Sequence, residues 1–184
     1  MRNMLKGVWD MATKALGIRV LPDRLLHPRH PNVTTIPIPG YCQVQTWTCG
    51  PVAALMVVHH FHPSVHAKRV FGLAAADPHQ GTSVARLVRT LRGCGIRVAQ
   101  RNDLGFQDII GAIDCGHPIM TVVRTNTPGI SHWVVLYGYG KRPNRVYVAA
   151  NGLPLMSQRE YPWGIFRQHH WTDLGFGLVC AGPK

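Results

Sequence analysis

The spacing of apolar residues predicts three helices in the first two thirds of the chain. Residues 51–60 form a continuous apolar run that opens with Cys49-Gly50-Pro51. Proline is tolerated there because the first amides of a helix have no intrahelical partner. Residues 83–92 and 106–114 each place four apolar side chains at helical spacing, and glycine follows each segment. These patterns indicate one buried helix and two helices with a single apolar face.

The later part of the chain has the pattern of strands. Four segments are rich in valine, isoleucine and aromatic residues, and Asn-Thr-Pro-Gly and Gly-Lys-Arg-Pro-Asn turns separate the first three. The simplest arrangement for consecutive strands is an antiparallel meander. Helices followed by strands predict an α+β fold. The four predicted strands are 118–124, 132–139, 145–150 and 176–180.

Residues 1–35 are predicted to be an N-terminal arm, followed by a single domain over 36–184. Within the arm, residues 1–16 carry apolar side chains at helical spacing, which indicates a short amphipathic helix. Residues 21–31 contain three prolines and so predict a linker that runs over a surface. We expect the arm helix to pack against its own domain. Binding to a membrane or to a partner is the alternative.

The chain is globular in composition and strongly basic. Of its 184 residues, 46% are hydrophobic and 15% are charged, with 20 Lys and Arg against 8 Asp and Glu, a formal net charge of +12. Such a charge attracts anionic surfaces and acidic polypeptides. The basic residues are scattered and not grouped with aromatic residues, so we expect no specific nucleic-acid partner. Contact with an anionic surface stays open.

We expect a cytoplasmic location. The longest apolar run, 52–58, is shorter than the roughly 20 residues that a membrane-spanning helix needs. Charges at Arg2, Lys6, Asp10 and Lys14 interrupt any signal-peptide core. Export as an effector protein stays an alternative.

Among five cysteines, Cys49 has the sequence context of a nucleophile. The number is odd and no Cys-x-x-Cys pair occurs, which excludes a zinc ribbon and a disulfide framework. Cys49 stands where a buried helix is predicted to begin, and the positive potential of a helix N-terminus lowers a thiol pKa. Cys115, in contrast, is expected at the end of a helix, where the same dipole raises it.

A general base and a residue to orient it are available in the strand region. His132 opens one predicted strand and Asn151 follows the next, so antiparallel pairing would bring both to the same end of the sheet. The histidines at 59, 60, 62 and 66 form a second cluster, but Pro63 interrupts their helix and no carboxylate accompanies them. We therefore expect no metal and no other cofactor.

Several short blocks stand in a characteristic order along the chain, and Gln43 lies six residues before the first of them. The blocks are Cys49-Gly-Pro-Val-Ala-Ala-Leu-Met56, Gly81-Thr-Ser83, Gly95-Ile-Arg-Val98, His117-Pro-Ile-Met120 and His132-Trp-Val-Val-Leu-Tyr-Gly138. In order and spacing they resemble the C39 and C39-like branch of papain-fold cysteine peptidases over about residues 36–180. The segment 157–171 also resembles the short helix ending in tryptophan that follows the triad in those proteins.

The resemblance implies a papain-like fold, in which an N-terminal helical part carries Cys49 and an antiparallel sheet carries His132 and Asn151. It further implies Cys49 as nucleophile, His132 as general base and acid, and Asn151 as the residue that orients His132. Gln43 and the Cys49 amide would form the oxyanion hole, with Gln45 as the competitor of Gln43. C39 members usually carry aspartate, commonly in Asp-Pro, where this chain has Asn-Gly. Asparagine is the choice of the papain group.

The implied function is that of a bacterial cysteine peptidase that forms an acyl-enzyme and cleaves a peptide or protein after small residues of the Gly-Gly type. The net charge suggests that acidic substrates are preferred. The alternatives are a non-catalytic peptide-binding module, a papain-fold amidase or acyltransferase, and an effector toxin. The presence of Cys49, Gln43 and His132 together argues against a non-catalytic module.

Overall fold

The computed structural model describes residues 18–20, 32–125, 127, 129–150, 158–172 and 175–183. The helical elements are η2 (Thr46–Thr48), α2 (Cys49–Phe61), α3 (Ala67–Ala74), α4 (Val84–Gly93), α5 (Phe106–Asp114), α6 (Trp163–Ile165) and the π-helical turn η4 (Phe166–His170). The strands are β1 (Ile18–Val20), β2 (Val33–Thr35), β3 (Tyr41–Gln43), β4 (Arg97–Asn102), β5 (Ile119–Arg124), β6 (Ser131–Gly140), β7 (Arg145–Ala150), β8 (Gln158–Pro162) and β9 (Phe176–Ala181).

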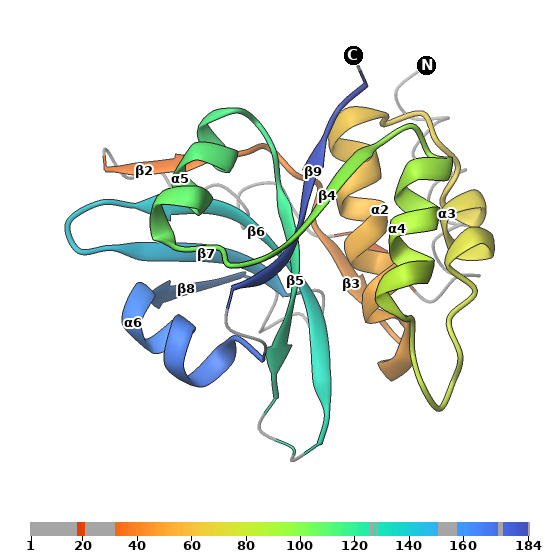
Figure 1. The fold of residues 1–184 in the computed structure, drawn as a ribbon. Coiled ribbons are helices and arrows are strands. Elements are labelled where there is room, and N and C mark those ends of the chain that lie inside the picture. The colour runs from red at the N-terminus through yellow and green to blue at the C-terminus, as the bar shows by residue number, and fades with distance from the viewer. Residues whose placement is uncertain are drawn as a thin grey trace.

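The main sheet has the strand order β4-β9-β5-β6-β7-β8, and each neighbouring pair in it is antiparallel. The predicted meander is therefore confirmed for β5, β6 and β7, and β8 continues it. Figure 1 shows α2, α3 and α4 gathered on one side of the molecule, and α5 and α6 on the other side together with β2, β6, β7 and β8. The predicted α+β class is confirmed.

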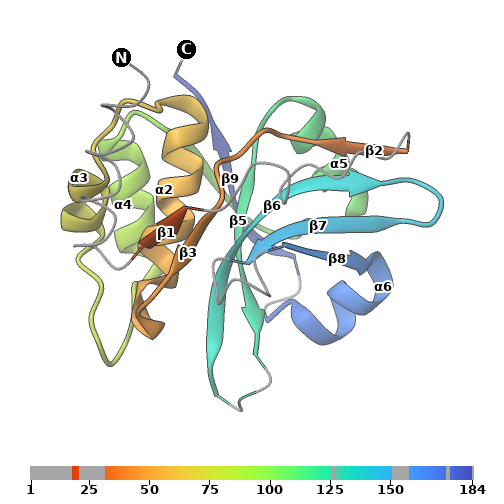
Figure 2. The same cartoon turned by 180° about the vertical axis from the view of Figure 1, so that it is seen from behind.

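Helix α2 is the centre of the core. All residues from Cys49 to His59 are buried, because α2 packs against β6, α3, α4 and β3 at once. A helix enclosed on every side has to be apolar all round, which is the pattern that the sequence has at 51–60. Figure 2, the view from behind, shows the small β1-β3 pair beside α2.

Two strands before α2 tie the early part of the chain to the rest. β1 pairs with β3, and β2 pairs with residues 138–140 of β6. The contact with β2 is so close that a Cβ on Gly138 would lie 2.8 Å from the Thr34 carbonyl oxygen. The whole of the predicted arm helix (1–16) and the whole of the predicted linker (21–31) lie outside the described residues, so the division of the chain at residue 35 stays a prediction.

Several elements are not predicted by the sequence pattern, among them the short strands β1, β2 and β3. The segment 157–171 contains β8 before its helix, which ends at residue 170. α3 and β4 had no prediction: α3 contains Gly72, and five of the six residues of β4 are exposed. Among the described residues, no helix combines the length and apolar character that crossing a membrane requires.

Candidate active site

Cys49 is the first residue of α2 and is held there by a tight turn. The turn η2 leads directly into the helix, and the Thr48 hydroxyl donates to the Gln45 carbonyl at 2.9 Å. The Thr48 amide donates to the same carbonyl at 3.2 Å. These bonds fix the direction in which α2 starts. Cys49 itself is only 7% exposed.

The thiol of Cys49 lies against the start of β6. The main-chain amide of Trp133 donates a hydrogen bond to it, in addition to the amides of Gly50 and Cys49. Because Trp133 directly follows His132, this bond places the sulfur beside the main chain that carries the predicted base. Two residues 83 positions apart in sequence are thus brought to one place, Cys49 by α2 and His132 by β6.

Burial dominates the electrostatics of Cys49. It raises the pKa of the thiol, and the main-chain hydrogen bonds from Trp133 and Gly50 only partly offset that rise. The helix-start argument predicted a lowered pKa, and that prediction is wrong for this thiol. The low dielectric around a side chain in the core penalises the thiolate more than the helix amides stabilise it.

His132 is half-buried and lies opposite Val123 in the β5–β6 ladder. On the other side of β6, Ala150 pairs with Val134, so β7 ends beside the start of β6 as the sequence predicts. Asn151, the next residue, lies outside the described residues. Its role toward His132 stays a prediction.

Gln43 and Gln45 differ in their surroundings. The Gln43 side chain binds to the turn before Cys49, because its Nε2 donates to the Thr46 carbonyl at 3.2 Å. Its Oε1 is buried, and no donor among the described residues reaches it. Gln45 is exposed, and it closes the turn through its main-chain carbonyl. Of the two, only Gln43 has a side chain ordered by the loop that leads to Cys49.

A contact that sequence reasoning missed joins α2, β6 and the loop before α4. The Trp133 Nε1 donates to the Thr82 carbonyl at 3.2 Å. A Cβ on Gly50 would lie 3.0 Å from the Thr82 Cβ, so only glycine fits there without displacing that loop. Two features of the sequence could have pointed to this contact. They are the glycine directly after Cys49 and the Gly-Thr-Ser block at 81–83. We call these three residues, Gly50, Thr82 and Trp133, the interlock.

The other cysteines have settings that differ from that of Cys49. All five cysteines lie within the described residues and form no disulfide. Cys42, Cys94 and Cys180 are buried in β3, after α4 and in β9, and burial raises the pKa of Cys180 to about 12. Cys115 lies at the end of α5, as the sequence predicts, and is exposed.

Two histidines of the cluster at 59, 60, 62 and 66 form hydrogen bonds within the fold. The Tyr41 hydroxyl donates to His59 Nδ1 at 2.6 Å, and His59 Nε2 donates to the Val65 carbonyl at 2.7 Å. His60 Nδ1 donates to the Pro37 carbonyl at 2.8 Å. Among the described residues, no group of three or more His, Cys, Asp or Glu side chains is placed to hold a metal ion.

Comparison with protein families identifies the chain. The profile of the Peptidase_C39 like family matches residues 35–178. The chain belongs to this family. The match spans η2, α2 and β6, and so includes both Cys49 and His132. A search of curated proteins gives no significant match.

Solved structures agree with the family in fold. A double-glycine-motif protease from an AMS/PCAT transporter, in complex with its leader peptide, superposes with a TM-score of 0.61 at 15% identity, covering 80% of this chain and 93% of that chain. The peptidase domain of Streptococcus ComA, a bifunctional ABC transporter of a quorum-sensing pathway, gives a TM-score of 0.62 at 18% identity, covering 84% and 100%. This C39-like chain therefore has the papain-like fold of those peptidase domains.

Proposed function

We propose that this C39-like protein is a cysteine peptidase with Cys49 as nucleophile and His132 as general base and acid. The observation that carries the proposal is the hydrogen bond from the Trp133 amide to the Cys49 thiol. It brings the sulfur to the main chain next to His132, in the region where the family profile matches. A thiol and an imidazole at the junction of a helix and a sheet are the parts that acyl transfer needs.

The raised pKa of Cys49 assigns a specific task to His132. A neutral thiol attacks a peptide carbonyl only if its proton leaves, and His132 accepts that proton as the sulfur–carbon bond forms. His132 then donates the proton to the leaving amine, which gives a thioester on Cys49 and a free amine. Water attacks the thioester, again with His132 as base, and releases a carboxylate and the thiol. Asn151 is proposed to orient the His132 ring.

The oxyanion of the tetrahedral intermediate would be held by the Cys49 amide and by Gln43. The Gln43 amide nitrogen carries two hydrogens, and one of them is used in the bond to Thr46. That bond holds the amide group in place without using up its donors. An exposed side chain such as Gln45 would first have to be ordered by the substrate.

The substrate is proposed to be a polypeptide with small residues, of the Gly-Gly type, on the acyl side of the cleaved bond. Only 7% of the surface of Cys49 is exposed, which leaves little room for a side chain beside the sulfur. The structural neighbour from an AMS/PCAT transporter is described as a double-glycine-motif protease and holds a leader peptide. The basic charge adds a preference for acidic peptides.

The test is cleavage of a net-acidic peptide that carries one internal Gly-Gly, analysed by mass spectrometry. We expect cleavage after the second glycine, no cleavage by Cys49→Ala, and a covalent adduct on Cys49 alone when the peptide ends in an electrophile at that glycine. Binding of the peptide without cleavage or adduct would overturn the proposal in favour of a binding module. Transfer of the acyl group to an added amine, without hydrolysis, would indicate an acyltransferase.

A further inference from the structure

Six basic residues of α3, α4 and the start of β4 are exposed or half-buried, and we call the surface that they form the basic face. From residue 65 to residue 100, the only acidic residue is Asp77, in the loop after α3. The other acidic residues that the structure describes, at 103, 108, 114 and 160, belong to α5, the loop before it and β8. The basic face consists of Lys68, Arg69, Arg86, Arg89, Arg92 and Arg97.

Four arginines of the basic face donate to main-chain carbonyls, and none of the four forms an ion pair with a carboxylate in the described parts of the chain. Arg69 Nη2 donates to the Gly93 carbonyl at 2.9 Å, and Arg86 Nη1 donates to the Ala75 carbonyl at 2.6 Å. Arg97 Nε donates to the Gly182 carbonyl at 2.8 Å. A hydrogen bond to a carbonyl fixes the position of a guanidinium group but does not neutralise its positive charge.

Two arginines on the sheet side pair with carboxylates instead. Arg101 pairs with Asp103, and Arg145 pairs with Glu160. These are the two ion pairs found among the described residues. Apart from the electrostatic attraction between Arg86 and Asp77, the basic face therefore carries positive charges that pair with no carboxylate of the described residues, and each anchored arginine keeps further N–H donors for a ligand.

The composition of the basic face favours one kind of ligand. Fixed guanidinium forks bind carboxylates in a bidentate way. The large apolar side chains that are exposed in the described parts of the chain are Val44, Leu73, Ile130 and Ile165, and none is aromatic, so the face offers no stacking platform for bases. Of these four side chains, only Leu73 belongs to α3 or α4, and it is 44% exposed. A single leucine is a poor anchor for a lipid surface.

We propose that the basic face is a docking surface for an acidic polypeptide segment, rich in Asp and Glu. The binding needs no catalysis, so it stands or falls apart from the peptidase proposal. Carboxylates of the segment would pair with Lys68 and with the arginines of α4, while Leu73 would contact an apolar side chain between them. The attraction would weaken with salt, because the face is open to solvent.

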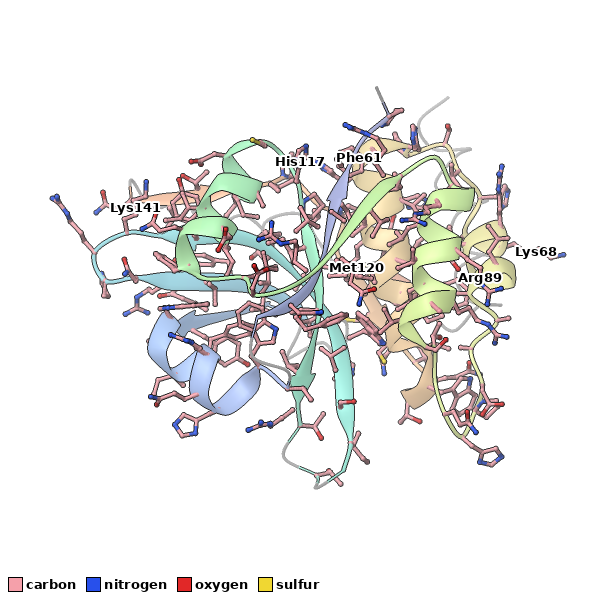
Figure 3. All side chains as sticks on the ribbon, in the orientation of Figure 1. Phe61, Lys68, Arg89, His117, Met120 and Lys141 are labelled. Carbon is pink, nitrogen blue, oxygen red and sulfur yellow. The ribbon has the colours of Figure 1, made fainter. Side chains whose placement is uncertain are left out.

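The experiment measures binding of fluorescent poly-L-glutamate to the Cys49→Ala protein at low salt. Lys68→Glu with Arg89→Glu changes the basic face, and Lys141→Glu with Arg167→Glu is the matched control. Both pairs reduce the formal net charge from +12 to +8. Figure 3 shows Lys68 and Arg89 at one end of the molecule and Lys141 at the other. We expect Kd to rise about tenfold or more for the first pair and about twofold or less for the control.

Three results would overturn the proposal. Equal losses in the two variants would show that only the net charge attracts polyglutamate. Tighter binding of duplex DNA, or of vesicles containing phosphatidylserine, with the same dependence on Lys68 and Arg89, would assign the face to nucleic acid or to a membrane. Unchanged binding in the first variant would exclude the face altogether. If that variant fails to fold by circular dichroism, Lys68→Gln with Arg89→Gln replaces it.

Discussion

The helical side and the sheet side of this protein are stabilised in different ways. Helix α2 is buried from Cys49 to His59 mainly among apolar residues, with one buried hydrogen bond between Tyr41 and His59, and arginines of α3 and α4 bind main-chain carbonyls. The sheet side has a buried polar network around Trp171. There, Trp171 Nε1 donates to the Thr121 hydroxyl at 2.6 Å, and that hydroxyl donates to the Phe176 carbonyl at 2.7 Å.

The candidate site takes one residue from each side. Cys49 belongs to α2 and His132 to β6, and the interlock of Gly50, Thr82 and Trp133 fixes one side against the other. Activity should therefore be sensitive to small changes at the junction that leave both sides folded.

His132→Ala should remove the reaction while the fold stays intact. We expect turnover to fall by about a thousandfold or more, and the Tm to change by only a few degrees. The rate at which a peptidyl electrophile labels Cys49 should fall as well, since the base that removes its proton is gone. Cys115, which is exposed, is an internal control, and a small thiol reagent should label it at an unchanged rate. Undiminished labelling of Cys49 by the peptidyl electrophile would contradict the assignment of His132.

Gln43→Ala should lower kcat by roughly a hundredfold with little change in KM, because an oxyanion donor acts mainly in the transition state. Gln45→Ala is the matched control and should retain nearly full activity. Steady-state kinetics on the Gly-Gly peptide measure both. Equal activities of the two variants would remove Gln43 from the oxyanion hole.

Gly50→Ala tests the interlock. The new Cβ would lie 3.0 Å from the Thr82 Cβ, so the loop before α4 has to move and the Trp133 bond to it is strained. We expect a loss of about 1–3 kcal/mol in the free energy of unfolding and a lower kcat. The control is Gly111→Ala, in the exposed face of α5, where nothing lies within 4 Å of the new Cβ. That change should raise the Tm slightly. Full activity of Gly50→Ala would show that the interlock does not position the site.

On the sheet side, stability should decline at alkaline pH through Cys180. Burial raises its pKa to about 12, whereas the unfolded chain releases the same proton near 9.0. Between these values unfolding releases a proton, so the free energy of unfolding falls as pH rises. Urea unfolding at several pH values above 8 should show a shallower decline for Cys180→Ala than for the unchanged protein. Cys115→Ala should leave the slope as it is, and an equal slope in all three proteins would contradict this prediction.

The helical side should show the opposite pH dependence, with a smaller amplitude. Burial lowers the pKa of His59 from its ordinary value of 6.5. The unfolded chain then binds a proton that the native protein does not, so stability is lost as pH falls below about 6.5. Urea unfolding between pH 5 and 7 should show a shallower slope for His59→Gln. His66→Gln, at an exposed position, is the control. An unchanged slope for His59→Gln would argue that another group governs the acid side.

The sequence predicts the elements of this fold that have a strong hydrophobic periodicity. It fails for elements that are held in place mainly by main-chain hydrogen bonds. The apolar runs of α2 and β6 are found easily because both elements are buried. β4 was missed because its side chains are exposed and it is held by hydrogen bonds to β9, which side-chain patterns do not reveal. For α3, Gly72 weakens the helical signal.

For the site, the motif predicted which residues to consider but not their environment. Cys49 and His132 were chosen from a helix start and a strand start, and the hydrogen bond from Trp133 supports that pairing. The direction of the Cys49 pKa was predicted wrongly because burial depends on which elements pack around the helix N-terminus. Thr82 was missed as a supporting residue because its contact with Gly50 exists only in the folded chain.

The close approach of β2 to Gly138 also bears on aggregation. β2 pairs with residues 138–140 of β6, beyond the point where β5 begins, and so covers main-chain groups that would otherwise form an open edge. An open strand edge is a template for pairing with another molecule. A chain shortened to begin at residue 36 would lose this cover and is expected to self-associate through β6. A chain that begins at residue 32 would keep the cover and stay dispersed.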